Sequence, residues 1–208
     1  MSSEYSPKGL RRTPQQSRSQ ESTDRMLDAA LAIIARDGMA GLSIAAVSSE
    51  SGVSNGALYH RFGDRHGLLV AAQDRFLSGV ESDWLTAAVP LRSLHDPEKL
   101  LTRLTQTYLR LFSERRALFH AFMITEWADP DLRARGAQTT RVAAREIVGL
   151  LTERFNCTPE AADTAYRIVF GQAIQLVLSV EEDTSVLCVE PKERIRHLVR
   201  GLRALLQP

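Results

Sequence analysis

Five consecutive residues, Gly52-Val53-Ser54-Asn55-Gly56, have the spacing G-x-S-x-G in which a serine can act as a nucleophile. In α/β-hydrolases that serine lies on a sharp turn between a strand and a helix of a parallel sheet. Here a helical pattern precedes Gly52, and no run of alternating strand residues occurs anywhere in the chain. The match therefore gives little support for a hydrolase, and we expect no enzymatic activity.

The same residues fit a turn between two short helices better. Ser43 can cap the first helix, and Gly52 can end it, because only glycine enters the left-handed conformation without a Cβ penalty. Val53 supplies an apolar contact after the turn, and Ser54 can cap a second helix over 55–61. A helix, a tight glycine turn and a capped helix form the helix-turn-helix arrangement, whose second helix lies in the major groove of DNA.

A third helix is predicted before this pair. Ser22 or Thr23 can cap it, and it runs to Arg36, where Asp37-Gly38 ends it. Its apolar residues recur at helical spacing and form one stripe against which the other two helices would pack. That stripe contains Leu27, Ala30, Leu31 and Ile34. We therefore expect a small three-helix DNA-reading head over 21–67.

The rest of the chain, 68–208, also has a helical pattern. Asp64 can cap a long fourth helix that closes at Pro90, although Gly67 in its first turn is unfavourable by about 1 kcal/mol relative to alanine. A short apolar helix is expected over 116–127. Four later helices each begin with a capping residue and proline: Asp96-Pro97, Asp129-Pro130, Thr158-Pro159 and Glu190-Pro191. The predicted fold class is all-α, with about nine helices.

Composition and charge indicate a globular protein and limit the classes of function that the chain could have. The 208 residues are 44% hydrophobic and 25% charged with a net charge of +1, which is ordinary for a globular protein. A disordered basic arm is expected over 1–20, where Lys8, Arg11, Arg12 and Arg18 could contact phosphates, the alternative being a merely solvated tail. Without an apolar leader or a membrane-spanning run, the chain is expected to be cytoplasmic.

Cysteine and histidine spacing supports neither a disulfide framework nor a metal site. Cys157 and Cys188 lie far apart, and the five histidines lack metal-binding spacing. No glycine-rich phosphate loop is present. We therefore expect no metal and no cofactor.

The motif series resembles the N-terminal head of TetR-family transcriptional repressors. It comprises Gly41-Leu42-Ser43, Ser51-Gly52-Val53-Ser54, Gly56-Ala57-Leu58-Tyr59-His60-Arg61-Phe62 and Leu68-Leu69. The resemblance covers about residues 22–72. Ser51 stands where that family usually has alanine, Arg61 where histidine is commonest, and Arg65 where lysine is usual, with His66-Gly67 replacing acidic or helix-forming residues.

The resemblance implies roles for the residues that match. Ser43, Tyr59, His60 and Arg65 would lie on backbone phosphates, with Ser54 as a cap and possible phosphate donor. Asn55, Gly56 and Ala57 would lie nearest the base edges, where asparagine can pair with adenine and alanine can contact a thymine methyl group. Arg18 and its arm would reach the minor groove or backbone. As alternatives, Tyr59 could be half-buried in the head and His60 merely solvated.

Two further sets of residues are candidates for dimerisation and ligand binding. The last two helices are apolar on one side, which either completes the core or forms the face of a homodimer that doubles the DNA site. Those residues are Tyr166, Phe170, Ala173, Ile174, Val177, Ile195, Leu198, Leu202 and Leu205. The candidate pocket residues, which could equally be plain core, are Trp84, Tyr108, Phe112, Phe119, His120, Phe122, Met123, Trp127, Gln138, Arg141 and Gln172.

The sequence favours a DNA-binding regulator, acting as a repressor that an unidentified small molecule releases from a palindromic operator. The ligand would prefer a dimer whose heads are wrongly spaced for successive major grooves. The alternative is a ligand-binding or scaffold protein whose head does not bind an operator, which the near-neutral charge and the altered Arg65-His66-Gly67 would favour.

Overall fold

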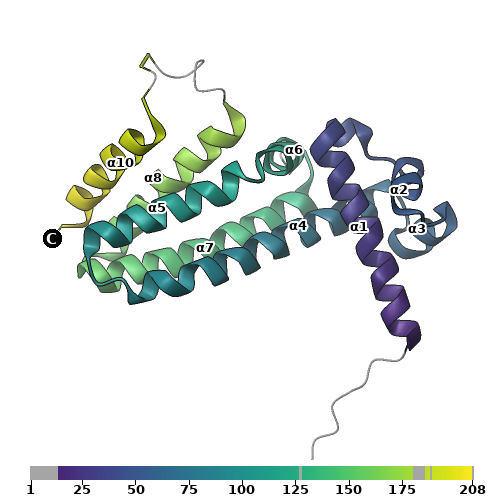
Figure 1. The fold of residues 1–208 in the computed structure, drawn as a ribbon, viewed down its shortest axis with the longest axis horizontal. Helices are drawn as coiled ribbons and strands as arrows, with labels where there is room; N and C mark the ends of the chain where they lie inside the picture. The colour runs from purple at the N-terminus through teal and green to yellow at the C-terminus, as the bar shows by residue number, and fades with distance from the viewer. Residues whose placement is uncertain (1–13, 127, 180–185, 188, 208) are drawn as a thin grey trace, which may run out of the picture.

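Helix α4 (Arg65–Ala88) belongs to two groups of helices at once, as Figure 1 shows. It packs with α1 and α3 of the head and with α7 and α5 of the larger domain. The computed structural model describes residues 14–126, 128–179, 186–187 and 189–207. Within these residues the structure contains helices and no strand, as expected for an all-α protein.

The other elements follow in chain order: α1 (Pro14–Gly41), α2 (Ile44–Ser51), α3 (Asn55–Phe62), η1 (Val89–Ser93), α5 (Pro97–Ser113), α6 (Arg116–Glu126), α7 (Pro130–Phe155), α8 (Pro159–Leu178) and α10 (Pro191–Leu206). Together with α4, nine α-helices lie within the described residues.

The capping residues of the head are confirmed. The hydroxyl oxygen of Ser43 accepts a hydrogen bond from the backbone N–H of Ala46 at 3.1 Å. Ser54 caps α3 in the same way, and the carboxylate of Asp64 caps α4 by accepting from the N–H of Gly67 at 2.8 Å. Each side chain thus satisfies a backbone donor that the first turn of a helix leaves without a partner.

Helix α1 begins earlier than expected. It starts at Pro14 rather than near Ser22, so residues 14–20 are helical and the expectation of a disordered arm over them is wrong. Thr23 does not cap a helix, because its hydroxyl donates to the carbonyl of Ser19 one turn earlier within α1. Proline is tolerated at the first helical position, where its missing N–H would have no helical partner. The expected arm residues Lys8, Arg11 and Arg12 lie outside the described residues.

Gly38 interrupts the long first helix where Asp37-Gly38 was expected to end it. Its φ of 69° and ψ of −172° are not helical, so the last residues up to Gly41 form a separate turn after a kink. The left-handed φ region favours glycine at this position. The kink turns the chain toward α2.

Gly67 is required in the first turn of α4, contrary to the view that it only weakens the helix. A Cβ atom at this position would collide with the backbone carbonyl oxygen of Phe62, the last residue of α3. Glycine therefore allows α3 and α4 to approach closely at the Gly63 turn, whose φ is 80°. This close approach outweighs the loss of helix propensity.

The helices of the larger domain enclose an aromatic core. Helices α4 and α7 run side by side along the molecule, α8 packs against α5 and α7, and α10 packs on α5 and α8 at the end remote from the head (Figure 1). Their proline starts agree with the prediction, except that the side chain of Glu190 makes no capping hydrogen bond to α10. None of the described helices is both long enough and apolar enough to cross a membrane.

Part of the apolar stripe of α8 and α10 faces the core of a single chain, and its role as a dimer face stays a prediction. Tyr166, Ala173, Val177 and Leu202 are all buried within one chain. The amphipathic helices turn this side toward α5 and α7, because that packing removes the most apolar surface from water. The other expected members are half-buried: Phe170, Ile174, Ile195, Leu198 and Leu205.

Candidate nucleic-acid interface and ligand cavity

Helix α3 exposes one face to solvent. Leu58 is its only fully buried residue and attaches the helix to the head. Asn55, Gly56 and His60 are exposed, and Tyr59 is 55% exposed, so Tyr59 is not half-buried in the core of the head. Ala57 is half-buried next to them. The face that the resemblance assigns to DNA is therefore largely exposed to solvent in the described part of the chain.

The turn between α2 and α3 is held by two serine side chains. Gly52 ends α2 with a φ of 67°, in the left-handed region. Ser48 donates its hydroxyl hydrogen to the carbonyl of Val53 at 2.7 Å, and the hydroxyl of Ser51 accepts from the N–H of Val53 at 3.3 Å. An alanine in place of Ser51 could not make the second bond. Ser51 is therefore a positioning residue that sequence reasoning missed.

Ser54 serves as a helix cap and not as a nucleophile on a strand. Its hydroxyl oxygen accepts from the N–H of Ala57 at 3.3 Å. Helix α2 and its glycine turn precede it, and the described residues include no strand on which a hydrolase elbow could be built. The G-x-S-x-G spacing therefore arises from a turn between two helices.

Arg65 makes contacts that sequence reasoning did not foresee. Its Nε donates to the carbonyl of Leu42 at 2.7 Å, and its Nη2 donates to the carbonyl of Met39 at 2.7 Å. The start of α4 is thereby fixed to the turn between α1 and α2. The side chain is exposed, and its Nη1 takes part in neither bond, so a phosphate contact by Arg65 stays a prediction.

Other cations lie near α3 or on α1. Arg61, in the last turn of α3, is exposed and makes no hydrogen bond or ion pair within the described part of the chain. Sequence reasoning did not select Arg61, although it neighbours His60 on a short exposed helix. Arg18 is exposed on α1, and its contact with DNA stays a prediction.

A cavity of about 440 Å³ lies within the larger domain, between α4, α5, α6, α7 and α8. We call it the central cavity. Its lining is mostly apolar and aromatic: Phe76, Leu77, Val80, Glu81, Trp84, Tyr108, Leu111, Phe112, Phe119, Phe122, Met123, Arg133, Gly136, Ala137, Thr139, Thr140, Arg141, Val142, Ala143, Phe170 and Ile174. A largely apolar enclosure with few polar groups is typical of a small-molecule site.

Many of the candidate pocket residues lie around the central cavity: Trp84, Tyr108, Phe112, Phe119, Phe122, Met123 and Arg141. His120 and Gln138 are exposed and do not line it, which corrects their assignment. Gln172 instead lines a separate groove of about 520 Å³ between α5, α8 and α10. Trp127 lies outside the described residues. Binding of a ligand by any of these residues stays a prediction.

The aromatic rings of the cavity support one another. The rings of Trp84 and Tyr108 meet edge to face, with centroids 5.5 Å apart and an angle of 88° between the planes. The hydroxyls of Tyr108 and Tyr166 are 3.3 Å apart, and the Tyr166 hydroxyl donates to the carbonyl of Thr140 at 3.3 Å. Burial, the charge of Tyr166 and the hydrogen bond between them raise the pKa of Tyr108 well above its ordinary value. The wall is therefore neutral here.

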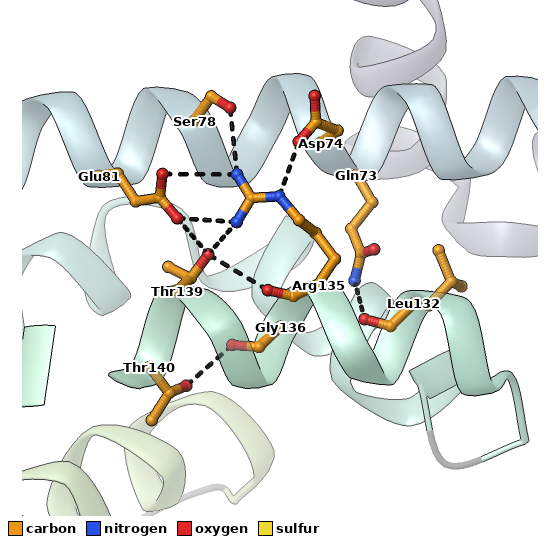
Figure 2. Close-up of polar contacts among 9 residues, drawn as sticks. All are labelled: Gln73, Asp74, Ser78, Glu81, Leu132, Arg135, Gly136, Thr139 and Thr140. Carbon is orange, nitrogen blue, oxygen red and sulfur yellow. Dashed lines mark hydrogen bonds and ion pairs between the residues drawn. The ribbon is translucent and has the colours of Figure 1, made fainter. Parts of the chain in front are cut away.

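Arg135 connects α7 to α4, as Figure 2 shows, and its partners Glu81 and Thr139 line the cavity. Its guanidinium donates to Glu81 and to Asp74, each at 2.7 Å, and to Ser78 at 3.1 Å. Thr139 donates to the same Glu81 carboxylate at 2.6 Å. Partial burial alone would raise the pKa of Glu81, but the hydrogen bonds from Arg135 and Thr139 and the charge of Arg135 lower it. Glu81 is therefore held ionised.

A second polar cluster lies at the junction of the head and the larger domain. His66 Nε2 is 2.8 Å from a carboxylate oxygen of Asp129, which caps α7. The hydrogen bond from His66, then the backbone N–H of Leu132, lower the pKa of Asp129. Asp131 brings a third possible metal-ligating atom, all within 4.8 Å of one another. These residues are too far apart in sequence for a metal-binding spacing to reveal them.

Comparison with known proteins agrees with this geometry. Residues 26–72, which span the head, match the family described as bacterial regulatory proteins of the tetR family. A comparison with curated proteins finds no match. The family match covers α2, α3 and the start of α4, where the caps and the glycine turn lie.

Solved structures resemble most of the chain. A candidate TetR-family transcriptional regulator from Mesorhizobium loti MAFF303099 is 17% identical, with 91% of this chain and 96% of that chain covered and a TM-score of 0.74. The multidrug binding protein EbrR complexed with malachite green is 24% identical, with coverages of 86% and 96% and a TM-score of 0.62. A candidate transcriptional regulator from Saccharomonospora viridis in complex with choline is 18% identical, with coverages of 90% and 96% and a TM-score of 0.64.

These three structural likenesses, each under 25% identical, show a shared fold, and the family match covers the head. An exposed α3 behind a serine-stabilised turn is the arrangement that a DNA-binding regulator of this kind requires. Residues 26–72 match the tetR family of bacterial regulatory proteins, and most of the chain shares the fold of a TetR-family regulator of known structure.

Proposed function

We propose that this regulator is a homodimeric repressor that binds a two-fold symmetric operator in the cytoplasm and leaves it when a small molecule occupies the central cavity. The observation that carries the proposal is the exposed face of α3, with Asn55, Tyr59 and His60 exposed while Leu58 is buried. Side chains at the start of such a helix can reach base edges in the major groove. The helix is too short to read a long site alone, so two copies are needed.

Support for a dimer comes from the outward side of α8. Ile168 is 40% exposed and Leu178 is 44% exposed, which is unusual for large apolar residues on an otherwise polar helix surface. Gly171 and Gly201 lie exposed on α8 and α10 and would let two copies approach closely. We infer that these outward faces pair, with the buried stripe of each helix completing its own chain.

Helix α4 supplies a route from the cavity to the DNA. Its middle lines the central cavity through Phe76, Val80 and Trp84, while its first residue, Arg65, is hydrogen-bonded to the turn before α2. An effector that favours a different tilt of α4 would therefore shift the head with it. By linkage, such a ligand must bind the released dimer more tightly than the DNA-bound dimer.

The test is selection of a binding sequence from random duplex DNA, followed by gel-shift titration at physiological salt. The proposal expects a palindromic sequence that the dimer prefers at least 1,000-fold over random DNA, in the range of specific binders. A folded dimer that selects no sequence would reject operator binding and leave a ligand-binding protein without DNA function. An effector that dissociates the dimer into monomers would contradict the release mechanism.

A further inference from the structure

The central cavity contains a buried hydrogen-bond donor without a partner. Trp84 is 4% exposed and lines the cavity, and its indole nitrogen makes no hydrogen bond with any described residue. An indole N–H can only donate, and buried donors in native proteins are nearly always paired. The nearby Tyr108 hydroxyl interacts with Tyr166 instead. The N–H of Trp84 therefore lacks an acceptor that a ligand could supply.

The more exposed edge of the same cavity carries two unpaired arginines. Arg133 and Arg141 both line it from α7, both are exposed, and neither guanidinium makes a hydrogen bond or ion pair within the described ranges. With Ala137 they follow an i, i+4, i+8 spacing, so all three lie along one face of α7. Arginine offers a planar set of donors that suits carboxylate oxygens.

The one carboxylate among the cavity-lining residues is not available to a ligand. Glu81 accepts from Arg135 and from Thr139, so its charge is already compensated (Figure 2). A cationic ligand would have to displace Arg135 from Glu81 and would also meet the positive charges of Arg133 and Arg141. The uncommitted charges of the cavity are thus all positive.

We infer that the central cavity binds an amphipathic anion, with an apolar or aromatic body among the rings, a carboxylate-type group at Arg133 and Arg141, and a neutral acceptor atom at the N–H of Trp84. The apolar body fits the aromatic walls, where Phe112 and Phe119 stack with centroids 4.3 Å apart. The inference rests on the proposal that this cavity is the effector site, and it names the chemical class of effector.

Three probes of matched shape test the charge preference: 4-phenylbutyrate, 4-phenylbutan-1-ol and 4-phenylbutylamine. Calorimetric titration of the full-length dimer should give a dissociation constant for the acid at least 10-fold lower than for the amine. Tighter or equal binding of the amine would overturn the inference. Failure of all three probes to bind would also overturn it, because the cavity would then not accept such ligands.

Substitution of the arginines assigns the preference to them. In the double variant R133Q/R141Q, affinity for the acid should fall about 10-fold while affinity for the alcohol changes less than 2-fold. R145Q is the matched control, because Arg145 is exposed on the same helix and does not line the cavity. An equal loss for acid and alcohol would show a structural effect and contradict recognition of the anionic group.

The acceptor site is tested with two derivatives of nearly equal shape, 4-(4-methoxyphenyl)butyrate and 4-(4-ethylphenyl)butyrate. The ether oxygen can accept from Trp84, whereas the methylene cannot. The preference for the methoxy compound over the ethyl compound should fall at least 3-fold in W84F, which keeps an aromatic ring but lacks the N–H. An unchanged preference would reject the contact.

Operator titration of the same proteins without probe separates this inference from the proposed function. Wild-type protein that distinguishes the acid from the amine but selects no operator would retain the effector chemistry and reject repression. Wild-type protein that binds its operator and prefers the amine would retain repression and reject the anion. The two proposals thus fail through different measurements.

Discussion

Arg65, the first residue of α4, donates from Nε to the carbonyl oxygen of Leu42 at 2.7 Å, across 23 residues of sequence. Its Nη2 reaches the carbonyl of Met39 at the same distance. One guanidinium therefore joins the helix that lines the central cavity to the turn that leads into α2. A residue that resemblance assigned to a phosphate also orients the head.

Replacing Arg65 with lysine tests this second role. R65K retains the charge but cannot donate in two fixed directions, so the free energy of unfolding should fall by about 1–2 kcal/mol, the range of a hydrogen bond from a charged group. Urea unfolding monitored by circular dichroism measures the loss. R61K is the control, because Arg61 makes no such bond in the described structure, and its stability should change by less than about 0.5 kcal/mol.

The same pair of variants separates positioning from direct contact with DNA. If Arg65 only contacts a phosphate, R65K would leave the unfolding curve unchanged and alter DNA affinity alone. If it positions the head, stability and operator affinity fall together. If R65K changed neither the stability nor the operator affinity, both roles would be contradicted.

Two glycines of α4 should respond oppositely to alanine. G67A places a methyl group against the carbonyl oxygen of Phe62 and should destabilise the protein by about 1–3 kcal/mol, as overpacking does. G79A meets no atom within 4 Å and should stabilise the helix by up to about 1 kcal/mol through propensity. Thermal unfolding of both variants checks the prediction. A neutral G67A would show that α3 and α4 can separate at little cost.

Sequence reasoning succeeded where the determinant is local. Ser43, Ser54 and Asp64 cap helices through a backbone N–H three residues away, so the residue type and its position suffice to predict them. The proline starts of α5, α7 and α8 are local in the same sense. The order of the helices and the fold class follow from these signals and the 3.6-residue apolar period.

Sequence reasoning failed where a residue's role depends on which other helix it contacts. Nothing in the sequence around Gly67 reveals the carbonyl of Phe62, and nothing around Arg65 reveals Met39. Periodicity identified the apolar side of α8 but could not say whether it faces another chain or the core of its own. The early start at Pro14 is not evident from the sequence, because a polar, basic composition is typical of disorder.

The pairing of Glu81 with Arg135 predicts a specific response to acid. Because the pKa of Glu81 is lowered on folding, the unfolded chain binds its proton more readily, and stability is lost as pH falls from about 4.3 through the lower folded value. At pH values above this range, the full contribution of the ionised Glu81 to the free energy of unfolding is present. E81Q should therefore be less stable than wild type at pH 7, by up to about 1 kcal/mol. It should also lose less stability than wild type between about pH 5 and about pH 3, the range that includes the ordinary pKa of glutamate.

Denaturant titrations at several pH values measure this difference. E153Q is a suitable control. Glu153 is also a glutamate, but it is exposed and its carboxylate has no partner among the described residues. Its curve should follow that of the wild type more closely than the curve of E81Q. Parallel acid unfolding of E81Q and wild type would contradict a lowered pKa.

The outward face of α8 predicts the effect of a charge on assembly. In I168E a carboxylate replaces a side chain that is 40% exposed in the single chain, so the monomer should fold while two copies repel each other across the proposed interface. Light scattering after size exclusion should show a shift from dimer toward monomer. T164E places the same charge one turn away on the same face of α8 and should shift the assembly in the same direction. A fully dimeric I168E would place the interface elsewhere.

Asn55 is the side chain at the start of α3 that can distinguish bases by paired hydrogen bonds. N55A should weaken binding to the selected operator by about 1–3 kcal/mol, roughly 5- to 150-fold, and relax the preference at one base pair in each half-site. The salt dependence of operator binding by N55A should stay the same, because no phosphate contact is removed.

R61Q should show the opposite pattern. It should lower affinity for all DNA sequences and reduce the slope of log affinity against log salt concentration by about 1 per half-site. Gel-shift titration across salt concentrations separates these patterns. If N55A lowers affinity uniformly across sequences, Asn55 holds the backbone and base reading must come from groove shape.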